Sequence, residues 1–142
     1  METFGTKQKG MNYKTRYGAY AVFFENNKVA VIETKQGYFL PGGNLENDEE
    51  TEQTVHREVL KELGWKLQIL KSIGKAEQYF FTRKEKKYFQ SVDLFYLAEK
   101  TGTSTSTSES NNHLHWLNPQ EAIQKVRFES QAWAIQKAKL SR

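Results

Sequence analysis

Short apolar segments separated by turn residues predict a small antiparallel sheet in the first third of the chain. Residues 16–24 and 28–34 are rich in aromatic and β-branched residues, and Glu25-Asn26-Asn27 between them is typical of a tight turn. We therefore expect a β-hairpin. Residues 38–40 add a third short strand, which Pro41-Gly42-Gly43 should end abruptly.

The spacing of apolar residues then changes to a helical period. Val55, Val59 and Leu63 recur every four residues and predict the buried stripe of a helix from about residue 50 to residue 63. Residues 48–51 are the acidic and capping types that a helix N-terminus prefers. Gly64 is expected to close the helix as its C-terminal cap.

The second half of the chain predicts another hairpin and two short helices. Residues 65–74 and 76–81 precede the charged turn 82–87 and a long strand at 88–98. The Ser/Thr-rich tract 101–110 predicts a flexible loop over residues 101–112, followed by a strand at 113–117. Asn118 and Pro119 should start one helix, and Ser130 should cap a last helix through Trp133 to Leu140. Interleaved strands and helices without a linker indicate one α+β domain over residues 1–142.

Composition narrows the possible functions. The 142 residues are enough for a single buried core, and a net charge of +4 is compatible with anionic partners such as nucleotides, although solubility explains it equally well. The absence of cysteine excludes disulfides, thiolate metal ligands and a cysteine nucleophile. The polar N-terminus is unlike a signal peptide, and the longest apolar run, residues 19–24, is too short to cross a bilayer. We therefore expect a cytoplasmic protein without a membrane partner.

One span combines glycines, carboxylates and an arginine at fixed intervals. After Gly43 come five residues and Glu49, then seven residues and Arg57-Glu58-Val59, then Lys61-Glu62 and Gly64-Trp65. This span, residues 43–65, resembles the Nudix box of the Nudix (MutT-like) hydrolases, G-x5-E-x7-R-E-U-x-E-E-x-G-U with U a bulky aliphatic residue. Seven of its nine specified positions agree, and the wider resemblance runs from about residue 16 to about residue 122.

The resemblance implies an α/β/α sandwich with a mixed sheet, and a pyrophosphohydrolase that cleaves a nucleoside diphosphate linked to another group X. It assigns Glu58 and Glu62 to Mg²⁺ (or Mn²⁺), with Glu58 also as a catalytic base. It makes Glu49 and Arg57 the residues that brace the loop and orient the helix, and it takes a backbone carbonyl near Gly43 as another metal ligand. Residues four apart on a helix lie one above the other, so Glu58 and Glu62 can share one cation.

Two positions depart from the box. Trp65 replaces an aliphatic residue, and Lys61 stands where the family usually has a third glutamate, often a metal ligand. Lys61 could pair with Glu58 and weaken metal binding, swing outward, or reach a substrate phosphate. One alternative function is therefore a catalytically weakened Nudix fold that binds a nucleotide or a partner without turnover. Another is action on the 5′ end of RNA, which no RNA-binding motif supports, and we expect no DNA partner.

Further site residues are predicted outside the box. Many relatives carry an additional acid on a loop before the residue matching Trp116; Glu109 is the candidate here, with Glu77 and Glu85 as alternatives. Arg16 and the aromatic residues Tyr17, Tyr20 and Phe39 are candidates for a base-binding pocket, although aromatic strand residues more often belong to a core. His56, His113 and His115 lack metal-ligand spacing. A homodimer is common among relatives.

Overall fold

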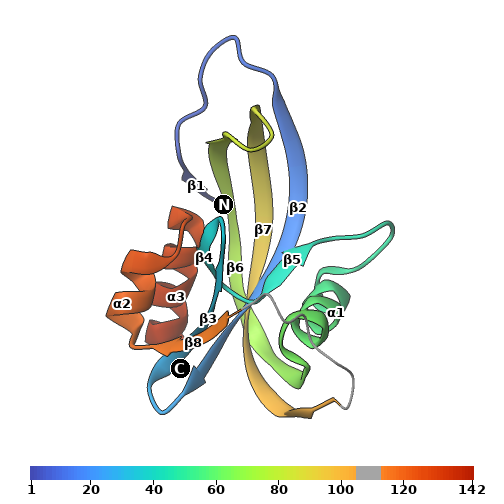
Figure 1. The fold of residues 1–142 in the computed structure, drawn as a ribbon, viewed down its shortest axis with the longest axis vertical. Helices are drawn as coiled ribbons and strands as arrows, with labels where there is room; N and C mark the ends of the chain where they lie inside the picture. The colour runs from blue at the N-terminus through green and yellow to red at the C-terminus, as the bar shows by residue number, and fades with distance from the viewer. Residues whose placement is uncertain (105–112) are drawn as a thin grey trace.

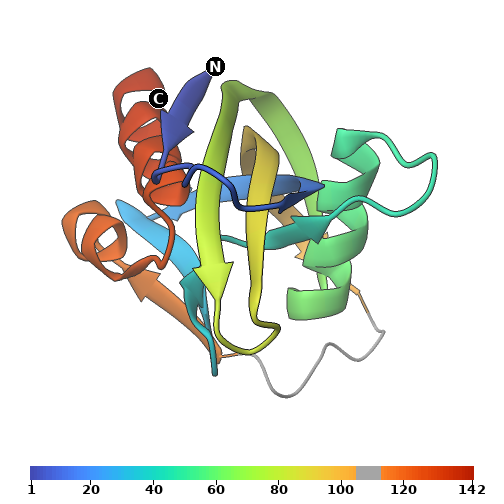
Figure 2. The same ribbon diagram turned by 90° about the horizontal axis from the view of Figure 1, so that it is seen from above.

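The computed structural model describes residues 1–104 and 113–142 as a three-layer α+β fold. Its strands are β1 (Glu2–Phe4), β2 (Tyr13–Glu25), β3 (Lys28–Thr34), β4 (Gly37–Phe39), β5 (Gly42–Asn44), β6 (Trp65–Thr82), β7 (Lys87–Thr103) and β8 (His113–Leu117). Its helices are α1 (Thr51–Leu63), α2 (Pro119–Lys125) and α3 (Glu129–Ser141). Helix α1 covers one side of the sheet, and α2 and α3 cover the other (Figures 1 and 2). The predicted sandwich is confirmed.

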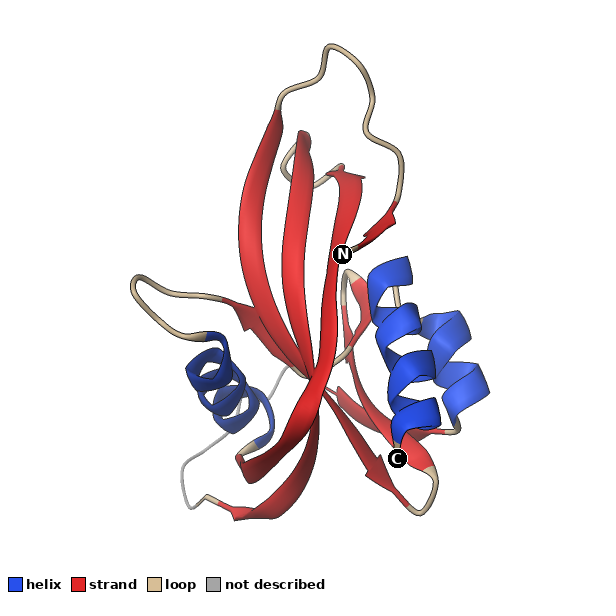
Figure 3. Ribbon diagram, turned by 180° about the vertical axis from the view of Figure 1, so that it is seen from behind, coloured by secondary structure: helices blue, strands red, loops and turns tan. Residues whose placement is uncertain are grey.

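Strand β2 organises the mixed sheet, whose main order is β1-β6-β7-β2-β3-β4. It pairs in parallel with β7 from Tyr13↔Tyr88 to Phe23↔Ala98, and antiparallel with β3 and with the short β5. The long antiparallel pair β6–β7 extends the sheet on one side, as the view from behind shows (Figure 3). Strand β2 therefore joins the two parts of the sheet and carries β5 beside α1.

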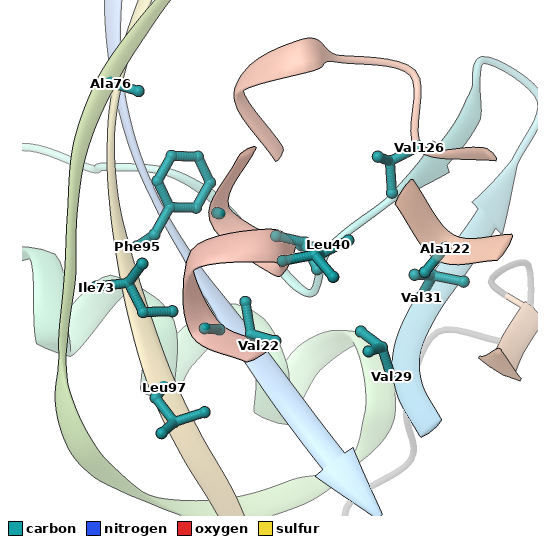
Figure 4. Close-up of a cluster of buried hydrophobic side chains, with 13 residues drawn as sticks. Val22, Val29, Val31, Leu40, Ile73, Ala76, Phe95, Leu97, Ala122 and Val126 are labelled. Atoms are coloured by element: carbon teal, nitrogen blue, oxygen red, sulfur yellow. The ribbon is translucent and has the colours of Figure 1, made fainter. Parts of the chain in front are cut away.

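Alternation along β2 builds a separate apolar core on each face of the sheet. Val22 packs with Leu40, Phe95 and Ile135 beneath α2 and α3, in the cluster drawn in Figure 4. Ala21 and Phe23 face the other way and pack with Val55 and Val59 of α1. Because successive strand residues point to opposite faces, one strand anchors both helical layers.

The predicted turns and caps are found where the sequence places them. Asn26 and Asn27 have φ of 52° and 62°, the left-handed backbone of a tight hairpin turn. Gly64 has φ of 71°, and its N–H donates to the carbonyl of Leu60 at 2.9 Å. The side chain of Asn118 accepts from the N–H of Glu121 at 2.9 Å and caps α2. At the β2–β3 turn, the end of α1 and the start of α2, residues close in sequence therefore determine the boundary.

Several boundaries differ from the predictions because distant pairing determines them. Residues 42–44, expected only to end a strand, form β5 by pairing with β2. Residues 65–82 form one strand whose register shifts absorb the expected break. Helix α3 begins at Glu129 with Phe128 as its N-cap, so the prediction of a Ser130 cap is wrong; the Ser130 N–H donates instead to Gln78 Oε1 at 3.0 Å.

Strand β7 extends into the tract that the sequence predicts as a flexible loop. Residues 101–103 belong to β7, where Thr103 pairs with Trp65 and Gly102 pairs with Lys66. Thr and Ser can form ladder hydrogen bonds as readily as other residues, so low complexity alone did not mark the strand end. Residues 105–112, including Glu109, lie outside the described residues.

Candidate active site

Helix α1 presents its polar side to β5 because its apolar side is fixed in the core. Val55 and Val59 are fully buried against the sheet. Arg57, Glu58 and Glu62 fall on the part of the helix that approaches the backbone of residues 42–44. The β5–α1 junction therefore collects the box residues that the sequence places on different elements.

Arg57 links the loop before α1 to the helix and to β5. Its Nε and Nη2 donate to the two carboxylate oxygens of Glu49 at 2.7 and 2.9 Å. Nη2 also donates to the carbonyl of Asn44 at 3.0 Å, and Nη1 donates to Glu58 Oε1 at 2.5 Å. A planar guanidinium is the side chain whose fixed fork can hold these groups at once.

Glu49 is fixed from several directions. Its Oε1 accepts from the hydroxyl of buried Thr54 at 2.6 Å and from the N–H of Glu46 at 3.1 Å. Hydrogen bonds from Arg57 and Thr54 lower the pKa of Glu49 to about 2, and the same pairing raises the pKa of Arg57. The Glu46 carboxylate also lies 3.3 Å from Arg57 Nη1, but its side chain is 69% exposed, against 13% for Glu49. Glu49 is therefore the carboxylate that the structure holds in place, and Glu46 forms an exposed ion pair. Asp48, Glu50 and Glu52 are exposed, as expected for helix-start charges.

Glu58 and Glu62 contact the two glycines at the start of β5. A Cβ at Gly43 would lie 2.8 Å from both Cδ and Oε2 of Glu58, so only glycine leaves room for this carboxylate. Glu62 Oε1 accepts from the N–H of Gly42 at 3.0 Å. Because Arg57 engages Oε1 of Glu58, Oε2 is the oxygen beside Gly43. The two carboxylates therefore lie along one short stretch of backbone.

The oxygens at this junction suit a hard divalent cation. Within residues 1–104 and 113–142, no group of three or more His, Cys, Asp and Glu side chains is arranged to hold a metal. Mg²⁺ does not need such a cage, because it usually binds through one or two carboxylates together with water and substrate phosphates. Glu58 and Glu62 fit this pattern, with a carbonyl of the Gly42–Gly43 pair as a third oxygen. Along an antiparallel strand, the backbone N–H and C=O groups of successive residues point alternately toward and away from the partner strand. Because the Gly42 N–H donates to Glu62, the backbone groups of Gly42 point toward α1 and away from β2.

The other candidate residues, which include acidic, basic and histidine side chains, differ in their exposure and their contacts. Lys61 is exposed on α1, one residue before Glu62. Glu77 accepts hydrogen bonds from Gln90 and Thr3, both at 2.8 Å, and these bonds lower its pKa. Glu85 is exposed in the turn between β6 and β7. His115 contacts Glu33 at 2.9 Å, His113 also lies on β8, and His56 is exposed on α1.

Arg16 and Phe39 lie on either side of a shared group of aromatic rings. The Arg16 guanidinium lies 4.9 and 4.8 Å from the ring centroids of Phe80 and Phe89. The Phe128 ring lies 4.6 Å from Phe80 and 5.8 Å from Phe39. The two predicted base-binding residues therefore border one aromatic group, on the side of the sheet covered by α3. Tyr20 stacks on Phe95, whereas Tyr17 is 58% exposed.

The family assignment follows from comparison with known sequences. The NUDIX domain profile matches residues 14–138, which include the clamp of Arg57 and Glu49, both carboxylates at β5, and the sheet that carries them. The chain belongs to the NUDIX family. The predicted resemblance is confirmed, and membership identifies this NUDIX protein as a hydrolase that acts on phosphorus anhydrides. A search of curated proteins finds no match.

Solved structures share the NUDIX fold at low sequence identity. A NUDIX hydrolase from Nitrosomonas europaea superposes with TM-score 0.72 and 17% identity, covering 90% of each chain. The E. coli dihydroneopterin triphosphate pyrophosphohydrolase gives TM-score 0.71 and 15% identity over 92% of this chain and 99% of its own. An ADP-ribose pyrophosphatase from Streptococcus suis gives TM-score 0.62 and 14% identity over 87% and 91%. At these identities the likeness establishes the fold.

Sequence reasoning missed two residues near the NUDIX site. Thr54 is an ordinary helix position in the sequence pattern, but its hydroxyl donates to Glu49 and fixes it. Asp93 is 4% exposed in β7, and burial raises its pKa to about 6, while a hydrogen bond from Ser91 and the charge of Arg16 oppose the rise. An acidic residue at an inward position of a predicted strand was the available signal for Asp93.

Proposed function

We propose that the protein is a Mg²⁺-dependent pyrophosphohydrolase that cleaves a nucleoside diphosphate linked to another group X. The observation that carries this proposal is the meeting of Glu58 and Glu62 at the Gly42–Gly43 backbone, next to the Arg57–Glu49 clamp. Carboxylates held against the glycine backbone of β5 would form a site for a cation and a diphosphate. The structural neighbours that are named an ADP-ribose pyrophosphatase and a UDP-X diphosphatase support this class of substrate.

Each box residue receives a role from its contacts. Arg57 holds Oε1 of Glu58, so Oε2 is the atom available to bind the cation or to accept a proton from the attacking water. Glu62 is a cation ligand whose Oε1 is oriented by the Gly42 N–H. Glu49 positions the Arg57 guanidinium and does not contact substrate. A carbonyl at Gly43 or its neighbour Gly42 completes the proposed donor set.

The bound metal would offset phosphate charge and lower the pKa of a water molecule. Arg16 and Phe39 would bind the nucleoside, since a guanidinium and half-buried aromatic rings suit a planar base. Strand β2 carries Arg16 and also pairs with β5, so one strand links the proposed base site to the proposed cleavage site.

A hydrolysis screen tests this proposal. ADP-ribose, UDP-glucose, GDP-mannose and the nucleoside triphosphates are incubated with Mg²⁺ or with EDTA, and the released phosphate products are quantified. We expect Mg²⁺-dependent release of a nucleoside monophosphate from at least one compound. Nucleotide binding without any turnover would instead support the weakened fold, and salt-sensitive binding to long RNA would support action on RNA 5′ ends.

Other properties of the protein stay predictions. They are the preference for Mg²⁺ over Mn²⁺, cytoplasmic location, a homodimer, and a catalytic part for Glu109, which lies outside the described residues. No helix in the described part of the chain is long and apolar enough to cross a membrane.

A further inference from the structure

Three adjacent strands place a row of polar side chains on the sheet face beneath α3. Arg16 of β2 is opposite Ser91 of β7, which in turn is opposite Gln78 of β6. Gly18 and Asp93 form the next pair on the same face, two residues further along both strands. Residues directly opposite one another share a face of the sheet, so Arg16, Ser91 and Asp93 lie on one surface. None of these residues takes part in the Arg57–Glu49 clamp.

Within residues 1–104 and 113–142, Arg16 has no hydrogen-bond acceptor. Its Nε is buried without a partner, and among the described residues no side-chain hydrogen bond or ion pair engages its guanidinium. The guanidinium lies over the Phe80 and Phe89 rings. Arg57, by contrast, donates to three different groups. A half-buried guanidinium without an acceptor is costly, and a ligand that supplies one would remove the cost.

Asp93 complements Arg16 with spare acceptors. The Ser91 hydroxyl lies 3.0 Å from each carboxylate oxygen of Asp93, and one hydroxyl can donate only one proton. Gly18 makes room for this carboxyl group, because a Cβ there would collide with Asp93 Oδ1. No ion pair joins Asp93 to Arg16 in the described part of the chain, although the Arg16 charge acts on it. A fixed donor and a fixed acceptor thus stand near each other without satisfying each other.

The surroundings of this pair suit a flat ring. Arg16, Tyr20, Phe80 and Phe128 are only half-buried and leave exposed ring and guanidinium surface, whereas Asp93 is 4% exposed and lies deeper. We propose that Arg16 and Asp93 form a guanine-recognition site, in which Arg16 donates to O6 and N7 of the base and Asp93 accepts from its N1–H and N2–H groups. This assignment rests on the proposed nucleotide hydrolase activity and names the base of its substrate.

Guanine is the base whose edge matches both groups. Arginine pairs with the adjacent acceptors O6 and N7 of guanine through two donors. A carboxylate has two acceptor oxygens, and guanine alone among the common bases offers two neighbouring N–H groups, on N1 and N2. Hypoxanthine lacks the 2-amino donor. Adenine has one amino group and no N1–H, so it leaves one carboxylate oxygen of Asp93 without a donor.

Binding of nucleoside monophosphates tests the proposal without requiring hydrolysis. Isothermal titration with GMP, IMP and AMP is expected to give GMP the lowest Kd, IMP an intermediate one and AMP a Kd higher than that of GMP by roughly ten-fold or more. Asp93→Asn should abolish most of the difference between GMP and IMP. Lys14→Gln, two residues from Arg16 on β2, is the matched control for loss of a positive charge and should keep the order of affinities.

The outcomes separate this proposal from the hydrolase assignment. Equal Kd values for GMP and AMP in the wild-type protein would overturn guanine recognition, even if Asp93→Asn failed to fold. If Asp93→Asn folds and its ratio of GMP to IMP Kd values equals that of the wild type, Asp93 does not take part in recognising the base. A GMP preference in a protein without Mg²⁺-dependent turnover would refute the hydrolase and leave the recognition site in place. Mg²⁺-dependent hydrolysis of nucleotides with every base at equal rates and affinities would support the hydrolase and refute guanine recognition.

Discussion

The guanidinium of Arg57 and the carboxylate of Glu49 form a two-point pair, with Nε and Nη2 each donating to a different oxygen at 2.7 and 2.9 Å. Glu49 precedes α1 and Arg57 lies within it, so this pair fixes the loop on the helix. The same guanidinium reaches Glu58. The orientation of a proposed metal ligand therefore depends on a residue that we do not expect to touch substrate.

The first prediction concerns the two-point hydrogen bonding between Arg57 and Glu49. Arg57→Lys keeps the charge but loses the fork, so Glu58 should lose its fixed position while the fold persists. We expect kcat/KM for the best substrate to fall by roughly ten- to a hundred-fold, with little change in the circular dichroism spectrum. Arg83→Lys, in the turn between β6 and β7, is the control and should be without effect. Wild-type activity in Arg57→Lys would contradict the positioning role.

The second prediction tests why glycine occupies position 43. A methyl group there would lie 2.8 Å from the Glu58 carboxyl group, which can move aside because it ends a flexible side chain. Gly43→Ala should therefore lower kcat strongly while changing the melting temperature little. Gly102→Ala is a matched control, because a Cβ at Gly102 has no neighbour within 4 Å. A large loss of stability together with normal kcat would show that Gly43 serves the fold and not Glu58.

The third prediction concerns Lys61. Its replacement by glutamate changes the local charge by two units next to Glu62 and restores the residue that the family usually has. Screened surface charges still contribute on the order of 1 kcal/mol, so the Mg²⁺ concentration for half-maximal hydrolysis should fall several-fold. Lys139→Glu, on α3 across the sheet, controls for net charge. An unchanged or higher Mg²⁺ requirement would indicate that Lys61 points away from the metal or contacts substrate.

The fourth prediction follows from the burial of Asp93. Its pKa of about 6 in the folded protein exceeds the ordinary 3.8, so the native state binds more protons than the unfolded state between pH 4 and pH 6. The contribution of Asp93 to wild-type stability should fall as pH rises through this window, by roughly 2–3 kcal/mol in total. The lowered pKa values of Glu49 and Glu77 act in the opposite direction, equally in both proteins. Asp93→Asn should lack that fall. Urea unfolding of both proteins from pH 4 to pH 7 measures the difference, and parallel stability curves would contradict a raised pKa.

The sequence predicts those features whose interactions join residues that are close together in the chain. The left-handed Gly64 cap, the Asn26-Asn27 turn and the Asn118 cap each depend on residues within a few positions of one another. The Nudix box is also local, since one loop, one helix and its cap contain it. Helix spacing alone brings Glu58 and Glu62 to the same side of α1.

Features that depend on strand register could not be predicted in this way. The juxtaposition of Arg16 and Asp93 results from the parallel pairing of β2 with β7, whose partners are about 75 residues apart in sequence. The closeness of Gly43 to Glu58 likewise requires β5 to pair with β2, a pairing that three residues give no pattern to reveal. Phe128 caps α3 because its neighbours Phe39 and Phe80 hold it there. Long-range contacts decided each of these positions.

The most direct test of the account is the Mg²⁺-dependent rate of nucleoside monophosphate release by wild-type protein and by Glu62→Gln, assayed side by side on the best substrate of the screen. Glu62 accepts from the Gly42 N–H and lies one helical turn from Glu58, so its amide variant should fold normally but lose a cation ligand. Glu52→Gln, an exposed position in the first turn of α1, is the matched control. We predict a loss of most Mg²⁺-dependent turnover in Glu62→Gln and none in Glu52→Gln. Equal kcat in wild type and Glu62→Gln, at the same Mg²⁺ concentration, would contradict the proposed metal site.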